Sequence, residues 1–560
     1  MADDHTMPSL KPEIENPSAN KTRKRTLGNV RVRHHETNEL ILVPTPSRDP
    51  NDPLNWSQTY KYYVATLICL AMMICNFLAA GPSVAIISTA RDFFPELFAT
   101  GQIPTAISKV AYFFTATALL QGAGNFFWMP LTNKFGRRPV YVSSYSLYFA
   151  TAMWLIFETN YGAFLAGRII LGLGSGAAET IAPVSIADLF FLHERGFVMG
   201  LYTSFLSIGV ALGILIDGWV SSGNQGTWLT HARFIVVHHD WQVIYQVGAA
   251  LIGLVLTLAF FTFPETACTR EASTNASSLS AERLSQKPGP SSADAENGVQ
   301  IPRKQPYLQR LKIFNKVWTQ ESLIKMFLRP LGLICLPPVL WAALVQSVTI
   351  GFLVAVSSNV SNAFYHAYAF EPWQVGLCFI SAIIGSLIGI PAGGQLGDLT
   401  ADYFTKRNRG VRDPEMRLPA MALCLITTPL ALILYGVGIE KHLHWMCPTI
   451  GLGLLNFSIS QGTNVCLVYV IDAYRPIAGE ITLAVTGFKS LFGFLLSFYT
   501  NTWVEQSGYL NAFGAMAGIS VAILMLWIPL YLWGKEIRHT TWHWPVLSYI
   551  HWDNDREVGE

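Results

Sequence analysis

The sequence is short of charge for its length. Only 13% of its 560 residues are Asp, Glu, Lys or Arg, while 51% are hydrophobic. Soluble domains carry about 25% charged residues, so we expect most of the surface to face lipid. This balance excludes an intrinsically disordered chain and a small secreted scaffold, and the net charge of +2 excludes a basic nucleic-acid-binding protein.

Several other signals are missing. The eight cysteines lie in or beside apolar runs and form no disulfide framework, so they are interpreted as packing residues. No signal peptide precedes Tyr62, where hydrophobicity begins. The absence of HExxH, GxSxG and paired intramembrane aspartates argues against an enzyme, and the absence of GxxxxGK[ST] argues against ATP-driven pumping. His34–His35 and His238–His239 lack partners at metal-ligand spacing, so we expect neither a metal nor a cofactor.

What the chain has instead is a series of long apolar runs. A membrane-spanning helix needs about 20 mostly apolar residues, and these runs show no charged outer face. The sequence therefore predicts an all-α membrane protein with twelve transmembrane helices, embedded in a lipid bilayer. The predicted spans are 62–87, 105–130, 139–157, 163–185, 197–219, 241–262, 330–356, 373–396, 418–438, 446–470, 477–503 and 510–533.

Polar breaks divide the spans six and six. The stretch Thr269 to Gln305 is of low complexity and predicted to be disordered. With the N-terminus in the cytoplasm, 32 of the 38 Lys and Arg fall on the cytoplasmic side and four outside, so both termini are predicted to be cytoplasmic. The predicted units are an N-terminal tail (1–60), a first half (61–263), a linker (264–329), a second half (330–534) and a C-terminal tail (535–560).

A similar loop follows the second span of each half, which suggests a duplicated transporter fold. The first copy reads MPLTNKFGRR, in which Gly136 permits a tight turn before two arginines. The second reads GGQLGDLTADYFTKRNRG. The loop residues expected to matter for conformational change are Asn133, Gly136, Arg137, Arg138, Gly394 and Asp398.

These loops resemble those of the major facilitator superfamily. Together with RIILGLGSG, FPET, DPNDPLNWS, RNRGVRDPEMRL and YVIDAYRPIAGE, they resemble fungal twelve-span carriers of the drug:proton antiporter type, near the branch with the yeast histidinol and polyamine permease. The resemblance covers about residues 45–535. It implies the major facilitator fold, a small-molecule substrate and the proton as coupling ion. We further expect a monomer in the plasma membrane or the vacuole.

The sequence departs from the family pattern at four positions. Met129 stands where the family has Gly, and Asn133 where it has the Asp taken to latch this loop to span 11. An Asn there predicts a weaker charge-based latch. In the span 5 antiporter signature, Ile214 replaces Pro and Asp217 replaces Gly.

Four charged residues fall within predicted spans, where each costs at least about 2.5–3.5 kcal/mol at the bilayer centre. They are candidate substrate or coupling residues: Arg168, Glu179, Asp217 and Lys489. Arg168 and Glu179 share one face of span 4 but lie roughly 16 Å apart, too far to pair. Arg168 is either a coupling residue, as the resemblance implies, or a ligand of backbone carbonyls. Glu179 either carries a proton or contacts a cationic substrate, or it forms a buried salt bridge.

Lys489 lies in a polar stripe that runs along span 11 from Thr482 to Thr500. It is interpreted as a coupling group, an anion contact or the partner of a carboxylate in the other half. Asp217 is expected to be a bridge or vestibule residue near the outer end of span 5.

Uncharged polar residues complete the candidate site. The resemblance implies that spans 1, 4, 7 and 10 line the central cavity. Polar side chains there either bind a polar substrate or join helices to one another. The candidates are Asn76, Gln346, Asn456, Gln461 and Asn464. Separately, Asn359 begins a glycosylation sequon at the predicted outer end of span 7.

We expect a secondary transporter of small organic molecules that works by alternating access. Proton-coupled efflux of a toxin or secondary metabolite is favoured. The alternative is an uptake permease for a cationic nutrient such as a polyamine, and a non-transporting nutrient sensor is a third reading.

Overall fold

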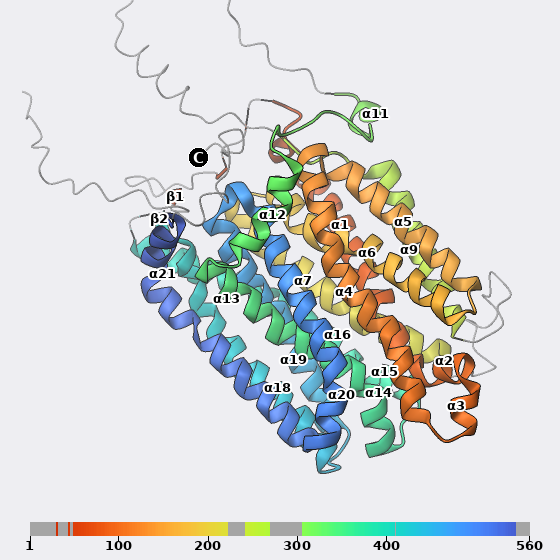
Figure 1. Ribbon diagram of the computed structural model, residues 1–560. Helices are drawn as coiled ribbons and strands as arrows, with labels where there is room; N and C mark the ends of the chain where they lie inside the picture. The colour runs from red at the N-terminus through yellow and green to blue at the C-terminus, as the bar shows by residue number, and fades with distance from the viewer. Residues whose placement is uncertain are drawn as a thin grey trace, which may run out of the picture.

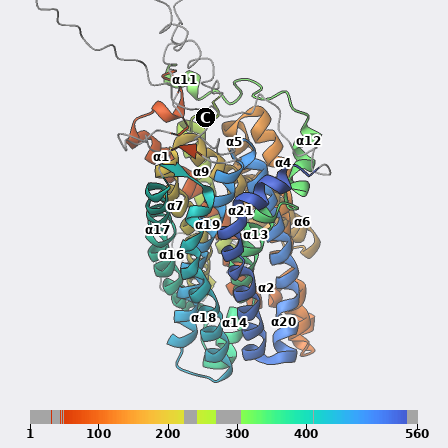
Figure 2. The ribbon, with the colours of Figure 1, turned by 90° about the vertical axis from the view of Figure 1, so that its left-hand side faces the viewer.

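The computed structural model shows an elongated bundle of helices that lie roughly along one axis (Figures 1 and 2). It describes residues 30–31, 43–44, 47, 49–221, 241–268, 305–408 and 410–544. The low-complexity stretch predicted to be disordered lies outside the described residues, apart from its last residue, Gln305. Both histidine pairs also lie outside them.

The first half consists of long helices with short connections. A short 3-10 turn, η1 (Pro53–Asn55), precedes them. The elements of the first half are α1 (Gln58–Ala80), the 3-10 segment η2 (Gly81–Ala85), α2 (Ile86–Phe93), α3 (Pro95–Ala99), α4 (Ile103–Phe135), α5 (Arg137–Phe157), α6 (Tyr161–Leu189), α7 (Leu192–Ser221) and α9 (Gln242–Thr262).

The second half follows two short helices, α11 (Tyr307–Arg310) and α12 (Leu323–Leu333). Its elements are α13 (Pro337–Gln346), the π-helical turn η3 (Ser347–Gly351), α14 (Phe352–Tyr368), α15 (Pro372–Cys378), α16 (Ile380–Gly393), α17 (Gln395–Arg407), the 3-10 segments η4 (Pro414–Ala420) and η5 (Arg475–Ile477), α18 (Met421–Glu440), α19 (Met446–Ala473), α20 (Ala478–Met525) and α21 (Trp527–Trp542). Two strands, β1 (Val30–Arg31) and β2 (Val411–Arg412), form a small antiparallel pair.

The helices confirm the predicted all-helical membrane fold. Ten helical stretches of the described residues are long and apolar enough to cross a membrane. The last of them contains two passes, because the backbone at Gly508 (φ +78°) is not helical and divides α20. Glu440 stabilises this turn by accepting a hydrogen bond from the Tyr509 amide at 2.9 Å. The remaining pass is α4, which packs within the bundle against α6 and α20.

Span 7 begins later than the sequence predicted. Residues from Pro330 onwards were expected to start it, but Pro330 belongs to α12, and the membrane-length stretch runs from Pro337 to Tyr368. A proline has no amide hydrogen to donate, so Pro337 suits the first turn of a new helix. Arg329 fixes α12 by ion pairs with Glu321 at 2.7 Å and Glu480 at 3.0 Å.

The two halves meet along matching pairs of helices. In one contact α4 packs along α20, and in the other α7 packs along α15 and α16. Glycine permits close approach here: a Cβ on Gly394 would lie 2.9 Å from Phe197 Cα. We call the end of the bundle that carries Arg137, Arg195 and Arg412 the basic end, and the other the distal end. The basic end lies at the top of Figure 1.

Candidate transport site

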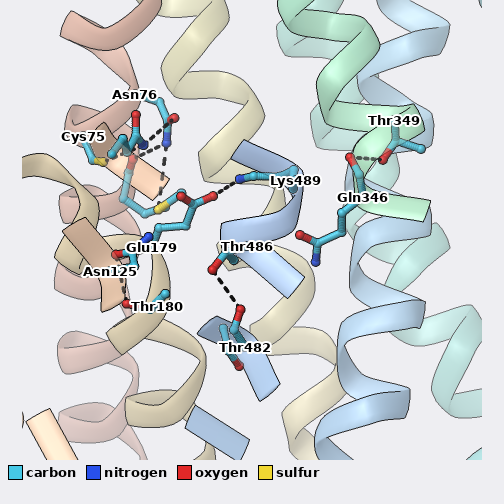
Figure 3. Close-up of polar contacts among 12 residues, drawn as sticks. Cys75, Asn76, Asn125, Glu179, Thr180, Gln346, Thr349, Thr482, Thr486 and Lys489 are labelled. Carbon is cyan, nitrogen blue, oxygen red and sulfur yellow. Dashed lines mark hydrogen bonds and ion pairs between the residues drawn. The ribbon is translucent and has the colours of Figure 1, made fainter. Parts of the chain in front are cut away.

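A buried ion pair joins the two halves in the interior of the bundle. The Lys489 ammonium of α20 donates to Glu179 Oε1 of α6. Both side chains are buried, with 7% and 1% of their surfaces exposed. Glu179 lies 18 residues into α6, roughly 27 Å along its axis, so the pair is far from either helix end. Figure 3 shows the two side chains reaching towards each other from opposite sides. Of the roles expected for Lys489, the bridge to the other half is the one observed.

The pair is incompletely satisfied. The second carboxylate oxygen of Glu179, Oε2, is buried and has no hydrogen-bond partner. The hydroxyl of Tyr202 on α7 donates instead to the backbone carbonyl of Glu179, at 2.8 Å. A buried carboxylate with a vacant acceptor can therefore take a further donor or a proton at this position.

Amide side chains lie beside Glu179 in the first half. Gln121 of α4 donates to Asn76 of α1 at 3.5 Å and to the Cys75 sulfur at 3.4 Å. Asn125, one turn further along α4, accepts from Thr180 at 3.2 Å, and its amide nitrogen is buried without a partner. The expected candidate Asn76 is thus at the site.

Gln121 and Asn125 were missed by the sequence reasoning. Two amides spaced four residues apart in an apolar span lie on one helix face, and this spacing could have identified them.

Residues of the second half face the pair from the other side. Thr482 and Thr486 lie on the same stripe of α20 as Lys489, and their hydroxyls donate to carbonyls one turn earlier at 2.8 Å. Gln346, at the end of α13, is buried, and its amide points towards the side of α20 that bears Thr486 (Figure 3). The structure therefore brings four expected candidates around one region: Asn76 of span 1, Glu179 of span 4, Gln346 of span 7 and Lys489 of span 11.

The span 10 candidates bond to neighbouring helices. Asn456 accepts from Ser207, and Asn464 donates to the Gly196 carbonyl at 3.1 Å, so both bond to α7 of the other half. Gln461 donates to the Ala420 carbonyl at 2.7 Å within its own half. Of the two roles left open by the sequence, these contacts match helix-to-helix bonding.

Arg168 is bound by backbone carbonyls near the distal end. Its guanidinium donates to the carbonyls of Phe113 at 3.2 Å, Leu78 at 2.9 Å and Ala79 at 3.5 Å. It also lies over the ring of Tyr245, with 5.9 Å between the guanidinium carbon and the ring centroid. As expected from helix spacing, Arg168 does not pair with Glu179.

Asp217 differs from its predicted role as a bridge or vestibule residue. Its side chain is completely buried, and neither carboxylate oxygen has a hydrogen-bond partner. A bridge would need a donor within reach, and a vestibule residue would be exposed to water. The sequence could not show this because it places Asp217 near the end of α7 without showing that η2 covers it.

The first loop motif is organised by Glu265, from the FPET segment. Its carboxylate accepts from the amides of Arg137 at 2.9 Å and Arg138 at 3.2 Å, at the start of α5. Burial raises the pKa of this carboxyl above its usual value, although these hydrogen bonds oppose the shift. Arg138 donates to the carbonyl of Phe260 at 2.6 Å, and Arg137 pairs with Asp188 at 2.9 Å.

The two loops make unequal latches between the halves. Asn133 lies against the start of α20: its Oδ1 is 3.4 Å from where a Cβ of Gly479 would be, and its amide nitrogen has no partner. In the second half, Asp398 lies against Gly196 at the start of α7 and pairs with Arg417 and, at 3.5 Å, with Arg412. The ion pairs of Asp398 lie within the second half, but its carboxylate meets the other half at Gly196, whereas Asn133 brings a neutral amide to its contact with α20. This difference is consistent with the expectation for Asn133.

A second cross-half ion pair lies at the basic end, where Arg195 of α7 pairs with Asp472 of α19 at 3.3 Å. Both side chains are largely buried. The two halves are therefore tied by charge at the basic end and, through Glu179 and Lys489, in the interior.

The expected glycosylation of Asn359 does not fit the structure. Asn359 lies inside α14, is 2% exposed, and donates to Asn501 at 2.9 Å. A glycan is bulky and needs an exposed acceptor. The buried Asn359 is therefore interpreted as a packing residue and not as a glycosylation site.

Comparisons with known proteins agree with this architecture. The family model of the Major Facilitator Superfamily matches residues 66–497. An uncharacterized MFS-type transporter of Schizosaccharomyces pombe is 26% identical, over 90% of this chain and 89% of its own. Protein HOL1 of Saccharomyces cerevisiae is 24% identical, over 91% and 92%. MFS transporter cpaT of Aspergillus oryzae is 24% identical, over 88% and 90%.

Solved structures show the same fold. The proton:xylose symporter XylE is 16% identical, with a TM-score of 0.55 over 85% of this chain and 97% of its own. The human organic anion transporter MFSD10 is also 16% identical, with a TM-score of 0.53 over 83% and 99%. The family match covers well over half of the chain, and the duplicated helical architecture agrees with it. The chain belongs to the major facilitator superfamily and is a multi-pass membrane transporter.

Proposed function

We propose that the protein is a proton-coupled secondary transporter that exports a small organic molecule by alternating access. The observation that carries the proposal is the buried ion pair between Glu179 and Lys489, which belongs to both halves at once. Alternating access requires the halves to rock about a central site, so a charge pair between them is placed to govern that movement.

A proton can operate this pair. Protonation of Glu179 removes the negative charge that holds Lys489, so the attraction between the halves is lost. The ammonium then becomes an unpaired buried charge, which is unfavourable unless water or substrate reaches it. Opening of the site supplies both, and loss of the proton restores the pair. One proton taken up and released would thus accompany each cycle.

The proposed orientation places the basic end in the cytoplasm, because 32 of the 38 Lys and Arg fall on the side of the N-terminus. Export is supported by the resemblance of the loop segments to drug:proton antiporters. We place the protein in the plasma membrane, acting on a toxin or secondary metabolite.

Uptake of a cationic nutrient is the second candidate, and one observation favours it. Glu179 Oε2 has no hydrogen-bond partner, so a protonated amine could bind there and displace Lys489. A polyamine has several such amines. In this case Lys489 is the group that occupies the site between substrate molecules.

The test uses purified protein in proteoliposomes, with radiolabelled spermidine and a cationic dye as probes. An imposed pH gradient is expected to drive accumulation of a probe, and its direction distinguishes export from uptake. Glu179→Gln is expected to abolish gradient-driven accumulation. Glu505→Gln, an exposed position on α20, is the matched control and should transport normally.

Gradient-driven transport that survives in Glu179→Gln would contradict the role of Glu179. Transport that ignores the pH gradient in the wild type would contradict proton coupling. If neither spermidine nor the cationic dye crosses the membrane, the nutrient-sensor alternative is favoured instead.

A further inference from the structure

We infer that Asp217 is a second proton-binding site, separate from the Glu179–Lys489 pair and close to the distal end of the bundle. Its binding of a proton stands on its own geometry, and its part in transport rests on the function proposed above. Asp217 lies in the last turns of α7, 25 residues after Leu192 and therefore roughly 38 Å along the helix.

The surroundings of Asp217 are closed and poor in donors. Its side chain is fully buried, and both oxygens lack a hydrogen-bond partner. The carboxylate lies against Gly81, so closely that a Cβ at that position would collide with it. Gly213, one turn earlier on α7, also lies close to this segment, with 3.2 Å between its Cβ position and Gly81 Cα.

An ionised carboxylate is poorly accommodated there. A buried charge without a partner is strongly unfavourable, whereas a neutral carboxylic acid avoids most of this cost. A metal cation does not fit as an alternative, because Na⁺-like and Ca²⁺-like ions need several oxygen ligands. The proton is the cation that this single, tightly covered carboxylate can bind.

Two titratable side chains on neighbouring elements act electrostatically on Asp217. They are Arg168, on α6, and Tyr245, on α9. The Arg168 guanidinium is engaged by carbonyls, two of which belong to Leu78 and Ala79 in the last turn of α1. These residues lie three and two positions before Gly81, which covers Asp217. Arg168 and Asp217 therefore both contact span 1 at the same place, where α1 ends and η2 begins.

This arrangement gives Asp217 two states. While α1 and η2 keep their present positions, Arg168 is satisfied by the carbonyls and Asp217 holds its proton. When this part of span 1 moves, Arg168 loses those carbonyls and becomes available to Asp217, whose proton is then released. Glu179 lies roughly 16 Å further along α6 from Arg168, so α6 carries both Glu179 and the arginine that would pair with Asp217 of α7.

Infrared spectroscopy of the protein in lipid nanodiscs tests the site directly. The variants are wild type, Asp217→Asn, Glu179→Gln and the exposed control Glu505→Gln. At neutral pH, we expect a carbonyl stretching band of a buried carboxylic acid that Asp217→Asn removes and Glu505→Gln keeps. Retention of the band in Glu179→Gln separates the two sites. Loss of only an ionised-carboxylate band in Asp217→Asn would overturn the inference.

Substrate-driven proton movement in proteoliposomes tests the role in transport. Asp217→Asn is expected to lose proton movement while substrate counterflow continues, and unchanged proton movement would overturn the coupling role. If the wild type moves no protons, the proposed function fails, while the infrared result still decides whether Asp217 binds one. Asp217→Ser is a smaller second variant, required to show the same loss of the acid band, should the Asn variant fail to fold.

Discussion

Breaking the ion pair between Glu179 and Lys489 should destabilise the protein more than removing the whole pair. Glu179→Gln leaves the Lys489 ammonium buried without its counter-ion, and Lys489→Met leaves the carboxylate in the same state. Both side chains are more than nine-tenths buried, so each single change is expected to cost about 3–5 kcal/mol. Replacing a buried pair by neutral groups of similar volume is often neutral or stabilising.

The double variant Glu179→Gln/Lys489→Met should therefore recover most of the loss. The measurement is a double-mutant cycle. The free energy of unfolding of each variant in detergent is obtained by denaturant titration, and thermal midpoints are a second readout. A coupling energy of about 3 kcal/mol or more between the two changes is expected. Single losses that simply add in the double variant would refute the view that these residues form a buried pair in the folded protein.

Three further predictions concern the basic end. Gly136→Ala should cost about 1–3 kcal/mol in unfolding experiments, because φ +103° and ψ 173° suit glycine alone; an unchanged midpoint would contradict this. Arg195→Ala should open the basic end, since it removes a buried cross-half pair with Asp472, and spin-label distances between the halves there should lengthen; unchanged distances would count against this latch. The raised pKa of Glu265 means that its ionisation opposes folding. The free energy of unfolding of the wild type, relative to that of Glu265→Gln, should therefore fall as pH rises from about 4.5 through the folded pKa. A relative stability that rises with pH would contradict this prediction.

The fold was largely predictable because a bilayer imposes a simple rule on sequence. Each pass needs a long apolar run, and these runs are visible without knowledge of tertiary contacts. The start of span 7 was not predictable in the same way. The apolar residues of α12 continue almost directly into α13, and the division depends on Pro337 and on the ion pairs of Arg329.

The residues of the site could be predicted from the sequence, but which of them pair with one another could not. Charge in an apolar run identified Arg168, Glu179, Asp217 and Lys489, because such residues are rare in membranes. Which of them pair depends on how two halves pack, and no spacing within one helix contains that information. The span 10 amides illustrate the same limit: their bonds to α7 cross from one half to the other.

The most direct test of proton-coupled transport is the lumenal pH of proteoliposomes while substrate moves down its own gradient. The wild type is expected to change lumenal pH as substrate crosses. Glu179→Gln is expected to exchange substrate without any pH change, since the proton carried at the buried pair is lost. A pH change in Glu179→Gln equal to that of the wild type would contradict the account.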